Sequence, residues 1–184
     1  MRRSVFGFLL VMGIVGASGS ASAGELQAAV GPSGLASTWR GDYGAGTGLR
    51  LGFRIKNLVS IDFVTRNSFV TVDTRMATWL SVGATLYGRL GKVRPYVRGF
   101  LVHQHEESMS AVKADPFGSL LGVGDGIRHR GGFGGGLGVD VPVNTSGAWQ
   151  WFLGGGSDAT FFPDVRGPKL YVALGAWLGV NYSL

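Results

Sequence analysis

The segment LYVALGAWLGVNYSL, residues 170–184, decides the fold class. From Leu170 to Leu184 every second residue is apolar or aromatic, whereas the residues between them mix rings, glycines and small polar groups. Successive side chains of a β-strand point to opposite faces, so a period of two predicts a strand with one apolar face and one mixed face.

The same alternation recurs in seven upstream segments. They cover residues 25–31, 49–55, 59–64, 80–87, 93–101, 132–141 and 149–154. Tight links at 56–58, 91–92 and 143–147 alternate with longer connections at 32–43, 67–74, 107–127 and 160–168. This rhythm predicts an all-β protein, an eight-stranded antiparallel up-and-down transmembrane β-barrel with short periplasmic turns and longer extracellular loops.

The composition excludes several other classes. Glycine occupies 33 of 184 positions, which disfavours a helix-rich protein because Gly costs about 1 kcal/mol relative to Ala inside a helix. The absence of cysteine excludes a disulfide scaffold and a cysteine-ligated zinc site. Hydrophobic residues make up 45% and charged residues 15% of the chain, so a disordered chain is excluded.

The N-terminus has the pattern of an export signal. Arg2 and Arg3 precede an apolar run from Val5 to Val15, and the small residues 21–23 fit a cleavage site. We therefore expect residues 1–23 to be a cleaved signal peptide and residues 24–184 to form the barrel domain. An exported chain rarely meets nucleic acid, so the basic pI does not predict a nucleic-acid partner.

The distribution of aromatic residues indicates which face meets lipid. The mixed face carries large rings among its glycines and arginines, as a crowded lumen requires. Trp149, Trp151 and Tyr182 lie on the apolar face near the short turns, where amphipathic rings form an interfacial girdle. Both features favour lipid outside, while a soluble lipocalin-like barrel with the apolar face inside stays open as an alternative.

The whole expected mature chain resembles the small outer-membrane β-barrel family, the OmpA-like and OmpX-like transmembrane barrels of Gram-negative bacteria. The resemblance rests on the pattern of strands. The ending Val180–Leu184 is similar to the signal read by the barrel-assembly machinery, although that signal usually ends in Phe or Trp rather than Leu. The resemblance implies an outer-membrane location, with membrane lipid and the assembly machinery as partners.

Nine charged residues are expected to project into the lumen. They are Arg50, Arg54, Asp62, Arg66, Arg89, Arg94, Arg98, Arg130 and Asp140. An eight-stranded barrel is about filled by its own side chains, so these charges favour a structural polar plug. A narrow, anion-favouring pore stays open because Arg exceeds acid. The inward glycines 132, 134, 136 and 138 leave space for long side chains from other strands.

A lipid-modifying enzyme is a further alternative, because lipid A deacylase and palmitoyltransferase barrels share this architecture. Such a hydrolase needs a serine, a histidine and a carboxylate in contact. Residues 103–110 supply these types, but no His and Ser share a strand face at short spacing. We therefore expect no enzyme and no cofactor.

The longest connection, residues 107–127, is expected to be an extracellular contact loop. It contains four apolar residues that a merely solvated loop would not need: Pro116, Phe117, Leu120 and Leu121. The protein's three histidines, His103, His105 and His129, flank it, and a symmetric hairpin would place His129 opposite His103. Because their spacing matches no specific metal motif, we expect rim histidines rather than a metal site, with a metal site as the weaker alternative. The leading function is therefore structural or surface interaction through the loops.

Overall fold

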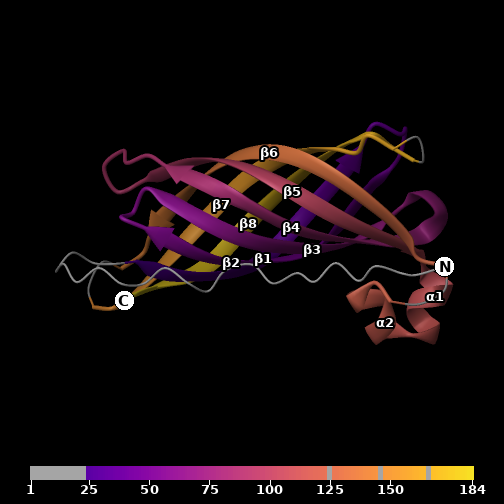
Figure 1. Ribbon diagram of the computed structural model, residues 1–184, viewed down its shortest axis with the longest axis horizontal. Coiled ribbons are helices and arrows are strands. Elements are labelled where there is room, and N and C mark those ends of the chain that lie inside the picture. The colour runs from indigo at the N-terminus through magenta and orange to yellow at the C-terminus, as the bar shows by residue number, and fades with distance from the viewer. Residues whose placement is uncertain (1–23, 124–125, 145–146, 165–166) are drawn as a thin grey trace, which may run out of the picture.

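The computed structural model describes residues 24–123, 126–144, 147–164 and 167–184, with the exception of the Leu120 side chain (Figure 1). The expected signal peptide, residues 1–23, lies outside the described residues. Among the described residues, no helix is both long enough and apolar enough to cross a lipid bilayer.

Eight strands close into one barrel in the order of the chain. They are β1 (Glu25–Ser37), β2 (Tyr43–Ile55), β3 (Val59–Val70), β4 (Arg75–Tyr87), β5 (Arg94–Ser108), β6 (Arg128–Pro142), β7 (Trp149–Phe161) and β8 (Leu170–Ser183). Every neighbouring pair is antiparallel, and β1 pairs with β8. Closure leaves no strand edge open, and the predicted fold class is confirmed.

The two faces of the barrel wall have opposite polarity. Large apolar side chains point outward and are exposed, among them Leu51, Phe63, Val82, Leu101 and Leu178. The inward face carries buried charges together with buried rings, including Phe100, Phe152, Tyr171 and Trp177. A water-soluble barrel would have the reverse arrangement, so the lipocalin-like alternative is wrong.

The first strand is longer than the sequence analysis predicted. It was expected to end near Gly31, but β1 continues to Ser37 through Pro32. Proline has no backbone N–H to donate, and the pairing of β1 with β8 is interrupted at residues 31–32 and resumes in the same register at Ser33. The barrel therefore accommodates Pro32 at a local gap.

The connections at the two ends differ less in length than expected. The turn end carries residues 56–58, 88–93 and 143–148, and the loop end carries residues 38–42, 71–74, 109–127 and 162–169. Lys56 and Asn57 both have positive φ, 50° and 56°, as the central residues of a type I′ turn require, and the backbone N–H of Leu58 closes the turn by donating to the carbonyl of Ile55. At the loop end, a short 3-10 turn, η1 (Val72–Thr74), replaces one expected long loop.

The long connection between β5 and β6 folds into two short helices beside the barrel wall at the loop end (Figure 1). These are α1 (Met109–Ala114) and α2 (Pro116–Leu121). Ser108 and Asp115 cap their N-termini by accepting hydrogen bonds from backbone N–H groups, and Gly122 ends α2 with a left-handed φ of 69°. The sequence predicted a loop here, and the two helices were not expected.

Candidate functional site

The charges in the lumen are grouped around arginines, and the group nearest the turn end centres on Arg50. Its guanidinium lies 3.5 Å from a carboxylate oxygen of Asp62 and 3.6 Å from one of Asp140. It also donates to the hydroxyl of Tyr87 and stacks over the ring of Tyr96, with 5.1 Å to the ring centroid. One cation therefore compensates two buried carboxylates.

Further contacts complete this lower group. Arg54 forms an ion pair with Glu25 on the neighbouring strand and lies over the ring of Tyr87. Asp62 accepts hydrogen bonds from the hydroxyls of Ser60 and Thr85. Its carboxylate is thereby held by neutral donors as well as by an arginine, which suits a fixed structural charge.

A middle group centres on Asp158 of β7. Its carboxylate pairs with Arg66 and lies 3.6 Å from the guanidinium of Arg98. The space for this carboxylate comes from Gly136 on β6, where a Cβ atom would collide with Asp158. The neighbouring inward glycine, Gly134, faces the ring of Phe100 in the same way, so side chains from other strands do occupy the space beside the glycine-rich strand.

The upper group lies near the loop end. Arg130 donates to Asp164 at 2.6 Å and to the backbone carbonyl of Pro168 at 2.8 Å. Glu106 pairs with Arg128 and lies 3.5 Å from Arg75. These contacts tie the loop after β7 and the tops of β4, β5 and β6 to one another.

Eight of the nine expected lumen charges lie on the inward face of the barrel, and Arg89 does not. Arg89 is exposed in the turn after β4, because that strand ends at Tyr87. Arg94 is half-buried beside its register partner Asp140. Six charged residues of these groups were not among the expected lumen charges: Glu25, Arg75, Glu106, Arg128, Asp158 and Asp164. Continuing the inward parity of β7 through residues 156, 158 and 160 would have found Asp158.

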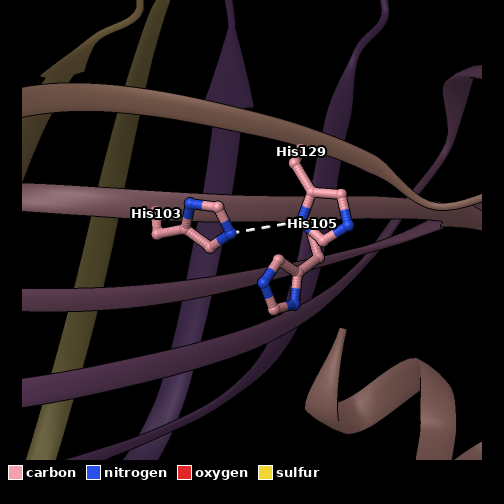
Figure 2. A group of neighbouring side chains, drawn as sticks. All are labelled: His103, His105 and His129. Carbon is pink, nitrogen blue, oxygen red and sulfur yellow. Dashed lines mark hydrogen bonds between the residues drawn. The ribbon is translucent and has the colours of Figure 1, made fainter. Parts of the chain in front are cut away.

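The three histidines converge on the outer face of β5 and β6 (Figure 2). Each offers one ring nitrogen, and these three atoms lie within 4.8 Å of one another. The Nε2 of His103 and the Nδ1 of His129 share a hydrogen bond of 3.1 Å. The register differs from the expected one, because His129 pairs with His105 and His103 pairs with Gly131. The observed pairing of β5 with β6 is therefore shifted by two residues from the expected one. A shift by two leaves every side chain on the same face, so the histidines still point outward.

The two glutamates beside the histidines lie on opposite faces. Glu106 points into the barrel and accepts hydrogen bonds from Gln104 and Tyr171, both at 2.8 Å. Glu107 points outward, is 3% exposed, and has no hydrogen-bond partner at either carboxylate oxygen among the described residues. Only Glu107 shares the face of the histidines.

The contact loop presents two of its four expected apolar residues as strongly exposed side chains. Phe117 is 78% exposed and Leu121 is 68% exposed, and Pro116 at the start of α2 is also exposed. The side chain of Leu120 lies outside the described residues. The hydroxyls of Ser108 and Ser110, two residues considered for an enzyme site, hydrogen-bond to each other at 2.8 Å.

Solved structures with a similar architecture are known, although sequence comparisons find no relative. No protein-family model matches the sequence, and no curated protein matches it. Neisserial surface protein A superposes with a TM-score of 0.58 at 17% identity, over 91% of this chain and 100% of that one. The N-terminal barrel domain of Pseudomonas aeruginosa OprF superposes with a TM-score of 0.54 at 15% identity, over 86% of this chain and 99% of that domain. The outer membrane protein OprG from Pseudomonas aeruginosa superposes with a TM-score of 0.50 at 13% identity, over 88% of this chain and 96% of that one.

These similarities are similarities of fold. The chain has the fold of the small eight-stranded outer-membrane barrels, and the predicted resemblance is confirmed at that level.

Proposed function

We propose that the chain is a bacterial outer-membrane β-barrel protein that makes contacts at the cell surface through the loop between β5 and β6. One observation carries this proposal: the helix α2, which lies outside the barrel, exposes Phe117 and Leu121. Exposed apolar side chains on such a surface helix are typical of a contact surface, because solvation alone would favour polar residues there.

Photo-crosslinking in intact cells tests the contact. A photoreactive amino acid at position 117 is expected to form a crosslinked protein band that the same residue at the exposed position 113, on α1, does not form. Equal crosslinking at both positions, or none at 117, would contradict a specific contact surface on α2.

The proposal places the chain in the outer membrane with its loop end outside the cell. Residues 1–23 act in this proposal as a cleaved signal peptide, and the assembly machinery reads the last strand. The apolar outer wall of the barrel supports contact with membrane lipid. Fractionation is expected to recover the protein with outer membranes, migrating faster on a gel before boiling than after. Recovery from the soluble periplasm would contradict the location.

The lumen is closed to solutes in this proposal. Paired charges and buried rings occupy it, which supports a plug rather than the narrow pore considered above. Purified barrels in planar bilayers should give small or rare conductance steps. A stable conductance of general-porin size would support the pore instead.

The chain is not an enzyme in this proposal. The two serines nearest the histidines hydrogen-bond to each other, which supports a structural role for them. Expression of the protein is expected to leave the mass profile of lipid A unchanged, and a shift by one acyl chain would favour the lipid-modifying alternative.

A further inference from the structure

We propose that His103, His105 and His129 form a binding site for one divalent transition-metal ion on the outer wall of the barrel, at the edge of the α1–α2 loop. Imidazole nitrogens are suited to zinc, copper and nickel. The site is independent of the surface contact proposed above, because that contact uses the exposed side of α2.

The distances between the rings are close to those of a metal site. A zinc ion bound to nitrogens at 2.0–2.1 Å in tetrahedral geometry separates them by about 3.4 Å. The nitrogens of His103 and His129 are 3.1 Å apart, and all three ligand atoms lie within 4.8 Å. Small ring rotations therefore bring three nitrogens into coordinating positions, and the ion replaces the single proton that His103 and His129 now share.

The burial of the His105 ring supports a bound metal ion at this place. Its side chain is 3% exposed, and its Nδ1 has no hydrogen-bond partner among the described residues. A buried polar atom without a partner is costly, so native proteins satisfy such atoms with a protein group, a water or an ion. An ion held with His103 and His129 would give the buried His105 ring a polar partner, and it would explain why three imidazoles gather at one point.

The backbone around the cluster holds the rings in place. His105 and His129 are register partners on paired strands, so their separation is fixed by the sheet. Gly122, which ends α2, packs directly against the His105 ring, and a Cβ atom there would collide with it. The loop therefore closes over one side of the cluster, and such rigid support is what a metal site needs.

The local charge favours a cation. Glu107 lies two residues beyond His105 on the same outward face, and it is buried without a partner among the described residues. A buried, uncompensated carboxylate lowers the energy of a cation nearby. Three histidines also leave a fourth coordination position for water or an external ligand. The cluster lies closer to the loop end of the barrel than the outward-facing pair Leu101 and Phe133. It is therefore at the edge of the apolar wall, where water can supply the fourth ligand.

Zinc titration of the full chain in detergent, after removal of metal with a chelator, tests the proposal. Calorimetry should show one zinc ion per barrel with sub-micromolar affinity. Cobalt in place of zinc should give the visible absorption of a tetrahedral nitrogen site. The chain contains three histidines, all in the cluster, so nitrogen coordination seen in the spectrum reports on this site alone.

Variants separate the site from adventitious binding. His129→Ala removes an exposed ligand and should weaken zinc binding by about 100-fold. Loss of a residue that only supports a metal ligand already lowers metal affinity by about 10–100-fold, so loss of a ligand itself should lower it at least as much. His105→Ala should have the same effect, with folding checked by gel mobility before and after boiling. Asp73→Asn, an exposed carboxylate in η1 at the same end of the barrel, should leave the affinity unchanged. Absence of a tight site in the wild type, or equal affinity in His129→Ala, would overturn the proposal.

Discussion

The lumen and the outer histidine cluster both concentrate polar side chains, yet they differ in how those side chains are compensated. Inside the barrel, Asp62, Asp140 and Asp158 each lie next to an arginine. On the outer wall, Glu107 and the Nδ1 of His105 are buried without a partner among the described residues. Each of these lumen carboxylates therefore has a cation beside it, whereas Glu107 has none among the described residues.

This difference separates a structural charge network from a binding site. Buried charges are tolerated when opposite charges and hydrogen bonds surround them, and their main consequence is then that removing one member is costly. A buried carboxylate with no cation beside it, close to clustered imidazoles in a rigid setting, is instead a candidate for binding a cation.

The largest effect is expected from Arg50→Ala in the lumen. This change leaves two buried carboxylates, those of Asp62 and Asp140, without their shared cation, and should lower the free energy of unfolding by about 3–5 kcal/mol. Urea unfolding in lipid vesicles measures it. Arg89→Ala, in the exposed turn, is the matched control and should change stability by no more than about 0.5 kcal/mol. Equal effects of the two changes would show that the lumen network is not structural.

The next effect concerns the outer face of the barrel. Val82 lies near the middle of β4 and is 49% exposed on the outer wall, so Val82→Arg places a charge in the apolar band and should cost about 2–4 kcal/mol. Leu90→Arg, in the turn after β4, should cost about 0–1 kcal/mol, as expected near an interface. Equal tolerance at both positions would mean that lipid does not surround the mid-height of β4.

The fold was predictable from the sequence because a barrel that faces lipid must alternate its side chains along every strand. The errors occurred where local signals were ambiguous. Pro32 indicated the end of a strand, but the interruption of pairing with β8 accommodates it. Arg89 has the parity of an inward residue, yet the strand ends before it. Parity describes a face only within a strand, so strand ends limit what it predicts.

The candidate sites were less predictable because they depend on contacts between distant segments. Six lumen arginines were predicted from parity, but Arg75 and Arg128, at the starts of β4 and β6, were missed. The partners Glu25 and Asp164 lie at a strand end and in a loop. Prediction of how the three histidines come together would have required the actual register of β5 and β6. It also needed the position of Gly122, which no periodicity of the sequence indicates.

Zinc itself should stabilise the barrel by an amount that depends on the outer cluster. A ligand that binds only the folded state at 100 times its Kd adds about 2.7 kcal/mol to the free energy of unfolding. Wild-type protein and Arg89→Ala should both gain this at a zinc concentration of 100 times the wild-type Kd, while His129→Ala, with its weaker binding, should gain only about 0.4 kcal/mol at the same concentration. Stabilisation that persists undiminished in His129→Ala would assign the zinc effect to another place on the barrel.

The smallest effect on stability is expected in the α1–α2 loop. Phe117 and Leu121 are largely exposed, so replacing each with serine should change the free energy of unfolding by no more than about 0.5 kcal/mol. The same replacement of Phe100, a ring buried in the lumen, should cost about 3–5 kcal/mol because it removes a packed aromatic side chain. The variant with both serines should nevertheless lose surface crosslinking, measured with a photoreactive residue at the exposed position 116, next to Phe117 in the chain. A loop variant that is as unstable as Phe100→Ser would show that these apolar side chains support the barrel rather than meet a partner.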